Sequence, residues 1–112
     1  KVESLAEALS AVKRITKQTG AAILCTLGKR GNIYSSPDIM CSCTVKRNKN
    51  ESIYCRSAFI AAFLKAYEFS GENIPYALQY ASAYSASVNG KGDIPNTDDV
   101  KKNLNGIDFK VY

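Results

Sequence analysis

The chain has 112 residues, of which 46% are hydrophobic and 22% charged, and this length and balance fit one globular domain over residues 1–112. A domain of this size can bury roughly two thirds of its unfolded surface, so a stable core requires neither a disulfide nor a metal. The longest largely apolar stretch, residues 58–64, is far shorter than the roughly 20 residues that cross a bilayer, which excludes a membrane span.

The net charge is +5, which suits an anionic ligand but is too small to indicate nucleic acid as a partner. The chain has no histidine, which removes Ser-His-Asp and Cys-His catalysis from consideration. Its four cysteines lack CxxC spacing, so a zinc site would need all four together, and we expect no metal. Cys25, in an apolar run, is expected to be a buried thiol. This cysteine usage predicts a reducing intracellular compartment and does not distinguish cytoplasm, mitochondrion and plastid.

The first elements in the chain indicate an α/β fold. Apolar residues recur at helical spacing from Leu5 to Ile15, and Gly20 supplies a stop, so the pattern predicts an amphipathic helix. Residues 21–27 then follow without polar alternation, which is typical of a strand buried on both faces in a parallel sheet. A helix that leads into such a strand favours the α/β class.

The rest of the chain alternates extended and helical patterns. From Ala58 the pattern is helical and strongly apolar until Gly71, so this helix should be largely buried. Pro75 suits the first turn of a following Ala-rich helix, whose small residues indicate close packing. In order we expect strands over 32–36 and 39–45, a polar loop over 46–50, helices over 58–69, 74–88 and 98–104, and an unassigned tail.

These elements include too few strands for a complete sheet. One strand buried on both faces needs neighbours along both of its edges. We therefore predict that the chain is one part of a larger α/β sheet or packs against a protein partner.

A glycine-rich turn follows the first predicted strand, with the sequence Thr-Leu-Gly-Lys-Arg-Gly over residues 26–31. Open α/β sheets place ligands at the carboxyl ends of their strands. Glycine lets the backbone approach an anion, and the Thr26 hydroxyl and the two cations can bind one. The spacing alone favours a hairpin with two solvated cations, and it is not a Walker A loop. Phosphate binding and a plain hairpin both stand as interpretations.

A second candidate site is the amino end of the helix that we expect to begin near Ser57. Free backbone N–H groups and the helix dipole favour an anion there. Ser57 would be the N-cap, which is favoured, or a phosphate donor, and Arg56 would either reinforce an anion site or fill it. No pair of carboxylates suited to acid/base catalysis stands out in the sequence.

Two surface patterns are better explained by packing and solvation than by ligands. The basic loop over 46–50 lacks interleaved aromatic residues, so a solvated loop is favoured over a nucleic-acid contact. Tyr76, Tyr80 and Tyr84 lie four residues apart on one helical face, which favours packing over a base-stacking platform.

The order of these motifs resembles the C-terminal part of the ribokinase/PfkB family of carbohydrate kinases, and the likeness covers nearly the whole chain. Residues 22–31 are similar to the family's strand that ends in Thr-Leu-Gly-x-x-Gly, and residues 57–59 to the start of its apolar helix. Residues 76–87 resemble its Ala-rich helix, and residues 90–100 its Gly, Pro and Val ending.

The resemblance implies a ribokinase-like three-layer α/β/α fold, of which this chain is the C-terminal, nucleotide-binding portion. It implies that Thr26 and Gly28 lie near ATP phosphates or ribose, that Gly31 belongs to the same site, and that Ser82 lies near the adenine. ATP and Mg²⁺ would be the cofactors of an active kinase. The expected partner is the missing N-terminal half, which holds the sugar site in this family, or another protein that completes the sheet.

The sequence departs most sharply from the family at its Asp-Thr-x-Gly-Ala-Gly-Asp signature, where residues 51–57 read Glu-Ser-Ile-Tyr-Cys-Arg-Ser. The family's glycines expose N–H groups as an anion hole, and its closing aspartate is the base that accepts the sugar proton. Here Ser57 replaces the aspartate, and Tyr54, Cys55 and Arg56 would project side chains into the hole. Loss of the base alone typically costs about 10²–10⁴-fold in rate.

Three functions follow from the resemblance. The favoured one is a catalytically degenerate kinase-like fragment or subunit, a pseudokinase with a structural, protein-binding role. The second is a part of an active ATP-dependent sugar kinase in which another acid replaces the aspartate, with Glu51 as the nearby candidate. The third is a nucleotide-binding regulatory module in which Thr26 and Gly28 still contact phosphate.

Overall fold

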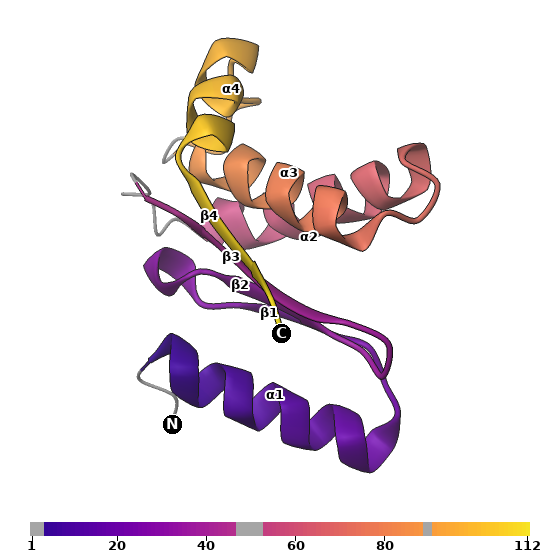
Figure 1. The fold of residues 1–112 in the computed structure, drawn as a ribbon. Coiled ribbons are helices and arrows are strands. Elements are labelled where there is room, and N and C mark those ends of the chain that lie inside the picture. The colour runs from indigo at the N-terminus through magenta and orange to yellow at the C-terminus, as the bar shows by residue number, and fades with distance from the viewer. Residues whose placement is uncertain (1–3, 47–52, 89–90) are drawn as a thin grey trace.

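The computed structural model describes residues 4–46, 53–88 and 91–112 (Figure 1). Helix α1 lies on one face of a central sheet, α2 and α3 cover the other face, and α4 lies at the end of α3 (Figure 1). The predicted α/β class and its three layers are therefore confirmed. The elements in chain order are α1 (Leu5–Thr19), β1 (Ile23–Thr26), the 3-10 turn η1 (Gly28–Arg30), β2 (Asn32–Ser35), β3 (Met40–Val45), α2 (Ile53–Phe69), α3 (Ile74–Ala86), α4 (Thr97–Asn105) and β4 (Ile107–Val111).

The sheet has the order β1-β2-β3-β4, and every neighbouring pair is antiparallel. The prediction of a doubly buried parallel strand over 21–27 is therefore wrong, because β1 spans only Ile23–Thr26 and is half-buried throughout. The cause is the short turn after Thr26, since a tight turn can join only antiparallel strands and a parallel pair needs a long crossover. Among the described strands, β1 has one neighbour and leaves its other edge open.

The tail that the sequence left unassigned forms β4, which pairs with β3. Ile107 lies opposite Val45 and Phe109 lies opposite Cys43, and both side chains pack against the core. Apolar residues at 107, 109 and 111 alternate with Asp108 and Lys110. This alternation is the pattern of a strand with one face on the core.

The predicted helix boundaries are confirmed where a cap or a breaker is present. Ser4 accepts a hydrogen bond from the N–H of Glu7 at the start of α1, and Gly20 ends this helix at a φ of +72°. Asn73 and Asn96 cap α3 and α4 in the same way as Ser4 caps α1. These caps lie at the starts of α1, α3 and α4, three helices that the sequence predicted.

Helix α2 begins at Ile53 rather than near Ser57. The intervening residues, Tyr54, Cys55 and Arg56, include no glycine or proline that would stop a helix, so the helical conformation extends through them. Ser57 is therefore the fifth residue of α2, and its predicted role as the N-cap is wrong. Residues 47–52, which include Glu51 and most of the predicted basic loop, lie outside the described ranges.

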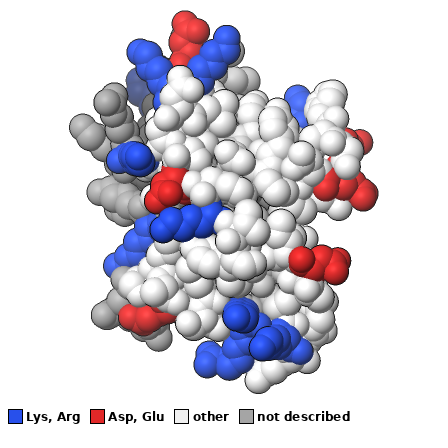
Figure 2. Space-filling model, in the orientation of Figure 1, with Lys and Arg blue, Asp and Glu red and all other residues white. Residues whose placement is uncertain are grey.

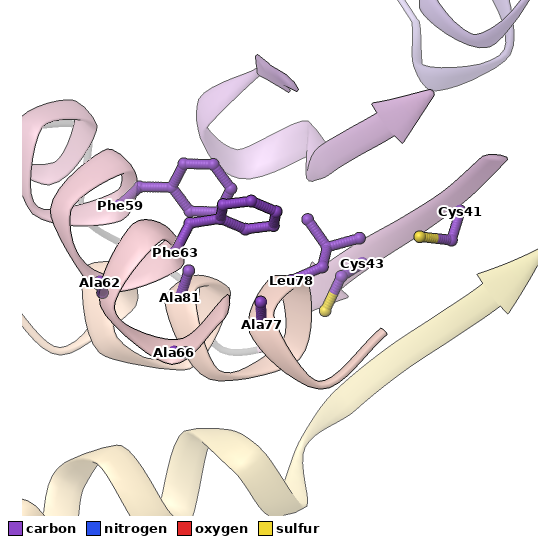
Figure 3. Packing of buried hydrophobic residues seen from close by; sticks show 9 residues of the cluster. All are labelled: Cys41, Cys43, Phe59, Ala62, Phe63, Ala66, Ala77, Leu78 and Ala81. Atoms are coloured by element: carbon purple, nitrogen blue, oxygen red, sulfur yellow. The ribbon is translucent and has the colours of Figure 1, made fainter. Parts of the chain in front are cut away.

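The main hydrophobic core lies between the sheet and the pair α2 and α3 (Figure 3). Phe63 is its aromatic centre, because its ring stacks on Tyr34 at 5.9 Å and on Tyr67 at 6.2 Å between centroids. A smaller cluster around Val12 and Ile33 joins α1 to the opposite face of the sheet. Each face of the sheet is thus held by its own helix layer. Within the described ranges, no helix combines the length and apolar character that crossing a membrane requires.

All four cysteines are in the thiol form and make no disulfide with one another. Cys41 and Cys43 are fully buried on β3, and burial is the main reason that the pKa of each is raised to about 11. Cys25 was expected to be buried, but it is only half-buried because its strand lies at the sheet edge. Burial also raises the pKa of Cys25.

We expect these thiols to make the fold less stable at high pH. The folded-state pKa values of Cys41 and Cys43, about 11, lie above the ordinary value of 9.0, so the unfolded chain loses these protons first. The contribution of these thiols to the free energy of unfolding should therefore be constant below pH 9 and decrease between pH 9 and pH 11. Urea unfolding across this range should show a weaker pH dependence for the C41A/C43A variant. An unchanged dependence would show that groups other than Cys41 and Cys43 cause the loss.

Candidate functional site

The glycine-rich turn between β1 and β2 is tightly folded. Thr26 pairs with Asn32 at the end of the two strands. The N–H of Leu27 donates to the carbonyl of Gly31 at 2.9 Å, and the N–H of Gly31 donates to the carbonyl of Gly28 at 3.2 Å. The φ angles of Gly28 and Gly31 are +60° and +113°, values that side chains disfavour. Both glycines are therefore required by the shape of the turn itself.

Gly31 is also fixed by its contact with β3. A Cβ atom built on Gly31 would lie 2.6 Å from Oγ1 of Thr44 and 3.0 Å from the carbonyl oxygen of Cys43. Gly31 is buried, so this space is not available to a side chain. The turn therefore packs directly against β3.

Asn32 connects the turn to α3. Its Nδ2 donates a hydrogen bond of 2.9 Å to Oγ of Ser82, a residue 50 positions away. Ser82 is 1% exposed, and a hydrogen bond with Ser82 partly offsets the raised pKa of Cys43. The structure thus links two of the predicted nucleotide residues, Gly31 and Ser82, through Asn32. Sequence reasoning missed Asn32, and only its place directly after the second glycine could have drawn attention to it.

A ligand at this turn would meet Thr26, Gly28 and Asn32 before Ser82. Gly28 is exposed, and Thr26 and Asn32 are half-buried, whereas the Ser82 hydroxyl lies inside the packing of α3 on the sheet. Arg30 is exposed beside them, and the side chain of Lys29 lies outside the described part of the chain. The turn can therefore offer a hydroxyl, an amide and a guanidinium to an anion.

The amino end of α2 carries the side chains of Tyr54, Cys55, Arg56 and Ser57. The Tyr54 ring lies over Gly92, because a Cβ atom on Gly92 would come within 2.9 Å of the ring. Tyr54 is 48% exposed, and Arg56 and Ser57 are exposed on the first turns of the helix. Cys55 is half-buried. Because Gly92 has no side chain, the Tyr54 ring can lie against the loop after α3.

A hollow of about 420 Å³ adjoins this end of α2 and is lined by Tyr54, Ser57, Lys65, Tyr84 and Asp93, among others. Asp93 comes from the loop after α3 and brings a carboxyl group to the same hollow as Ser57. The sequence pointed only to Glu51 as an acid near this site. Asp93 was missed because it approaches through the packing of α3 on α2 rather than through nearness in sequence.

The predicted tyrosine stripe packs on itself along α3. The rings of Tyr76 and Tyr80 stack at 6.2 Å, and those of Tyr80 and Tyr84 lie at 6.0 Å. Burial, followed by the neighbouring Tyr84 and Tyr76, raises the pKa of Tyr80. Within the described ranges, no group of three His, Cys, Asp or Glu side chains is placed to hold a metal ion.

The solved structures that are similar to this chain include two candidate phosphofructokinases. A candidate phosphofructokinase from Staphylococcus aureus matches with a TM-score of 0.79 and 23% identity over 100% of this chain. A candidate 1-phosphofructokinase from Thermotoga maritima matches with a TM-score of 0.75 and 10% identity over 99% of it. The chain has part of a phosphofructokinase-type kinase fold. It spans 37% and 36% of the two proteins, and neither the family models nor the curated proteins contain a match.

Proposed function

We propose that this chain is a kinase-like part that has lost phosphate transfer and acts by binding protein. The observation that supports this most directly is the amino end of α2, where Tyr54, Cys55 and Arg56 are already helical and carry side chains. A flexible glycine segment that turns its N–H groups toward a phosphate cannot exist in this conformation. Ser57, one turn inside the helix, offers a hydroxyl that is too weak a base to accept a sugar proton at neutral pH.

The surface of the chain favours a protein partner. Helix α2 carries apolar side chains on its outer side as well as toward the core, since Ile60 and Leu64 are 50% and 59% exposed. The open edge of β1 offers unpaired backbone groups on the same molecule. Because the similar kinases are almost three times as long as this chain, we propose that the partner is the remaining part of a kinase-like fold, on the same polypeptide or on another.

The test of inactivity is a phosphotransfer assay on the purified chain with ATP and Mg²⁺. Ribose, fructose, fructose phosphates and adenosine are offered in turn as acceptors. We expect no product above the rate without protein. Turnover near the roughly 1–100 s⁻¹ that is typical of kinases would overturn the proposal.

A second candidate function, part of an active sugar kinase with ATP and Mg²⁺, is favoured by the position of Asp93. Its carboxyl group shares a hollow with Ser57 and could replace the missing base. In this case the chain joined to its missing half would be active, and the D93N variant would lose about 10²–10⁴-fold in rate. Under the first proposal the joined protein is inactive with or without Asp93.

Retention of a nucleotide site is a separate question that calorimetry answers. If the turn binds phosphate, titration with ATP and Mg²⁺ should give heat that is reduced in an N32A variant, because Asn32 is the accessible amide at the turn. The T97A variant on α4 is a matched control, because Thr97 is exposed and far along the chain from the turn. No heat from the unchanged chain would exclude the nucleotide-binding module.

A further inference from the structure

We propose that a second hollow, on the α1 side of the sheet, binds a small organic carboxylate. The hollow has a volume of about 520 Å³, within the range of small-molecule sites, and lies between the last turns of α1 and the turn that joins β2 to β3. The α2 hollow lies on the opposite face of the sheet, and the glycine-rich turn lies at the other end of β2. The inference therefore does not depend on the proposed function.

Two buried hydroxyl groups form part of the wall of this hollow. Thr16 on α1 is 6% exposed and Ser35 on β2 is 2% exposed, and their oxygens lie 2.9 Å apart. One hydroxyl donates its proton to the other, so the second hydroxyl keeps a proton with which it can form a further hydrogen bond. A buried O–H group that faces a hollow is suited to donate to an oxygen of a bound molecule.

The charges around the hollow favour a singly charged anion. Lys13 and Lys17 lie one helical turn apart on α1, and both line it, whereas Asp38 lines the side formed by the β2–β3 turn. The two ammonium groups and the Asp38 carboxylate give the hollow a net charge of +1. The carboxylate of a bound ligand would neutralise this charge, whereas a phosphate dianion carries more negative charge than the hollow can balance. Figure 2 shows Lys and Arg side chains gathered over the C-terminal half of α1.

The remaining wall is apolar and suits the body of the ligand. Met40 and the ring of Tyr112 line the hollow. The Tyr112 ring is held in place because its hydroxyl lies 2.9 Å from Oγ of Ser42 and its N–H donates to the carbonyl of Met40 at 2.8 Å. We therefore expect an apolar ligand body against Met40 and Tyr112, with the carboxylate toward α1 and away from Asp38.

The chain provides its own reporter for this site, because Met40 is its single methionine. The methyl group of Met40 gives one NMR signal, which can be followed during titration with benzoate, with benzyl alcohol as the uncharged isostere and with inorganic phosphate. We expect benzoate to shift this signal to saturation and benzyl alcohol and phosphate to bind at least about tenfold more weakly. Equal or stronger binding of either comparison compound would overturn the proposal, as would an unmoved signal with benzoate.

Two variants test the residues that carry the inference. K13M/K17M should weaken benzoate binding by about tenfold or more, whereas K101M/K102M, which removes the same charge from α4, should not. T16V/S35A removes both hydroxyls, so that neither is left without its partner, and should also weaken binding. Thermal melting of each variant confirms that it is folded. Binding that survives both K13M/K17M and T16V/S35A, or that K101M/K102M weakens equally, would refute the site.

Discussion

Replacing Gly31 with alanine is expected to lower the free energy of unfolding by about 4 kcal/mol, a large share of what a small domain possesses. The φ of +113° with an extended ψ is a region open almost only to glycine, which costs about 1–3 kcal/mol for another residue. The new methyl group would also meet Thr44 at 2.6 Å and the backbone of Cys43 at 3.0 Å. Backbone cannot rotate away as a side chain can, so overpacking adds about 1–3 kcal/mol.

The matched control for Gly31 is Gly20, at the end of α1. Gly20 also has a positive φ, +72°, but nothing lies within 4 Å of the position of its Cβ atom. G20A should therefore cost about 1 kcal/mol, from conformation alone. Urea unfolding of both variants measures the difference. Equal losses would mean that the turn moves away from β3 easily and that the contact with Thr44 is unimportant.

Truncating Phe63 to alanine is expected to have an effect of similar size, about 3–5 kcal/mol. Phe63 is 5% exposed and stands between Tyr34 and Tyr67, so its loss removes two stacked ring contacts and leaves a cavity between α2 and the sheet. For a chain of this length, the melting temperature should fall by roughly 10–20 °C.

The next residue, Leu64, is the control for Phe63 because it lies on the same helix and is 59% exposed. L64A should change the melting temperature of the chain alone by only a few degrees. Calorimetry of both variants would decide the matter. A loss in L64A as large as that in F63A would show that the outer side of α2 is already buried in solution, as it would be in a self-associated chain.

Sequence patterns located α1, α3, α4 and the strands β2 and β3, but they missed the true start of α2, the environment of β1 and the strand β4. The caps at Ser4, Asn73 and Asn96 are local signals, because the hydrogen bonds that define them span two or three residues. The environment of β1 was wrongly predicted because an apolar run does not say whether a strand is central or at an edge. The strand β4 was not assigned, although the alternation of Ile107 and Phe109 with charged residues was visible.

The candidate sites divide in the same way. The glycine turn could be located because Gly28 and Gly31 determine its shape through hydrogen bonds inside six residues. The partners that complete the two sites, Asn32 with Ser82 and Ser57 with Asp93, come from elements far apart in the chain. Their meeting depends on how α3 packs on α2 and on the sheet, and no local pattern encodes that.

The pairing of β3 with β4 also has a consequence for biosynthesis. Residues 46–106 separate the two strands, so at about 5–20 residues per second the ribosome needs roughly 3–12 s to deliver the partner of β3. During this interval one edge of β3 in the nascent polypeptide, which includes Cys41, Cys43 and Val45, has no partner strand. Chaperones bind unpaired strand edges of this kind, and such edges aggregate when chaperones are scarce. We therefore expect the emerging chain to be prone to aggregation until β4 has been translated.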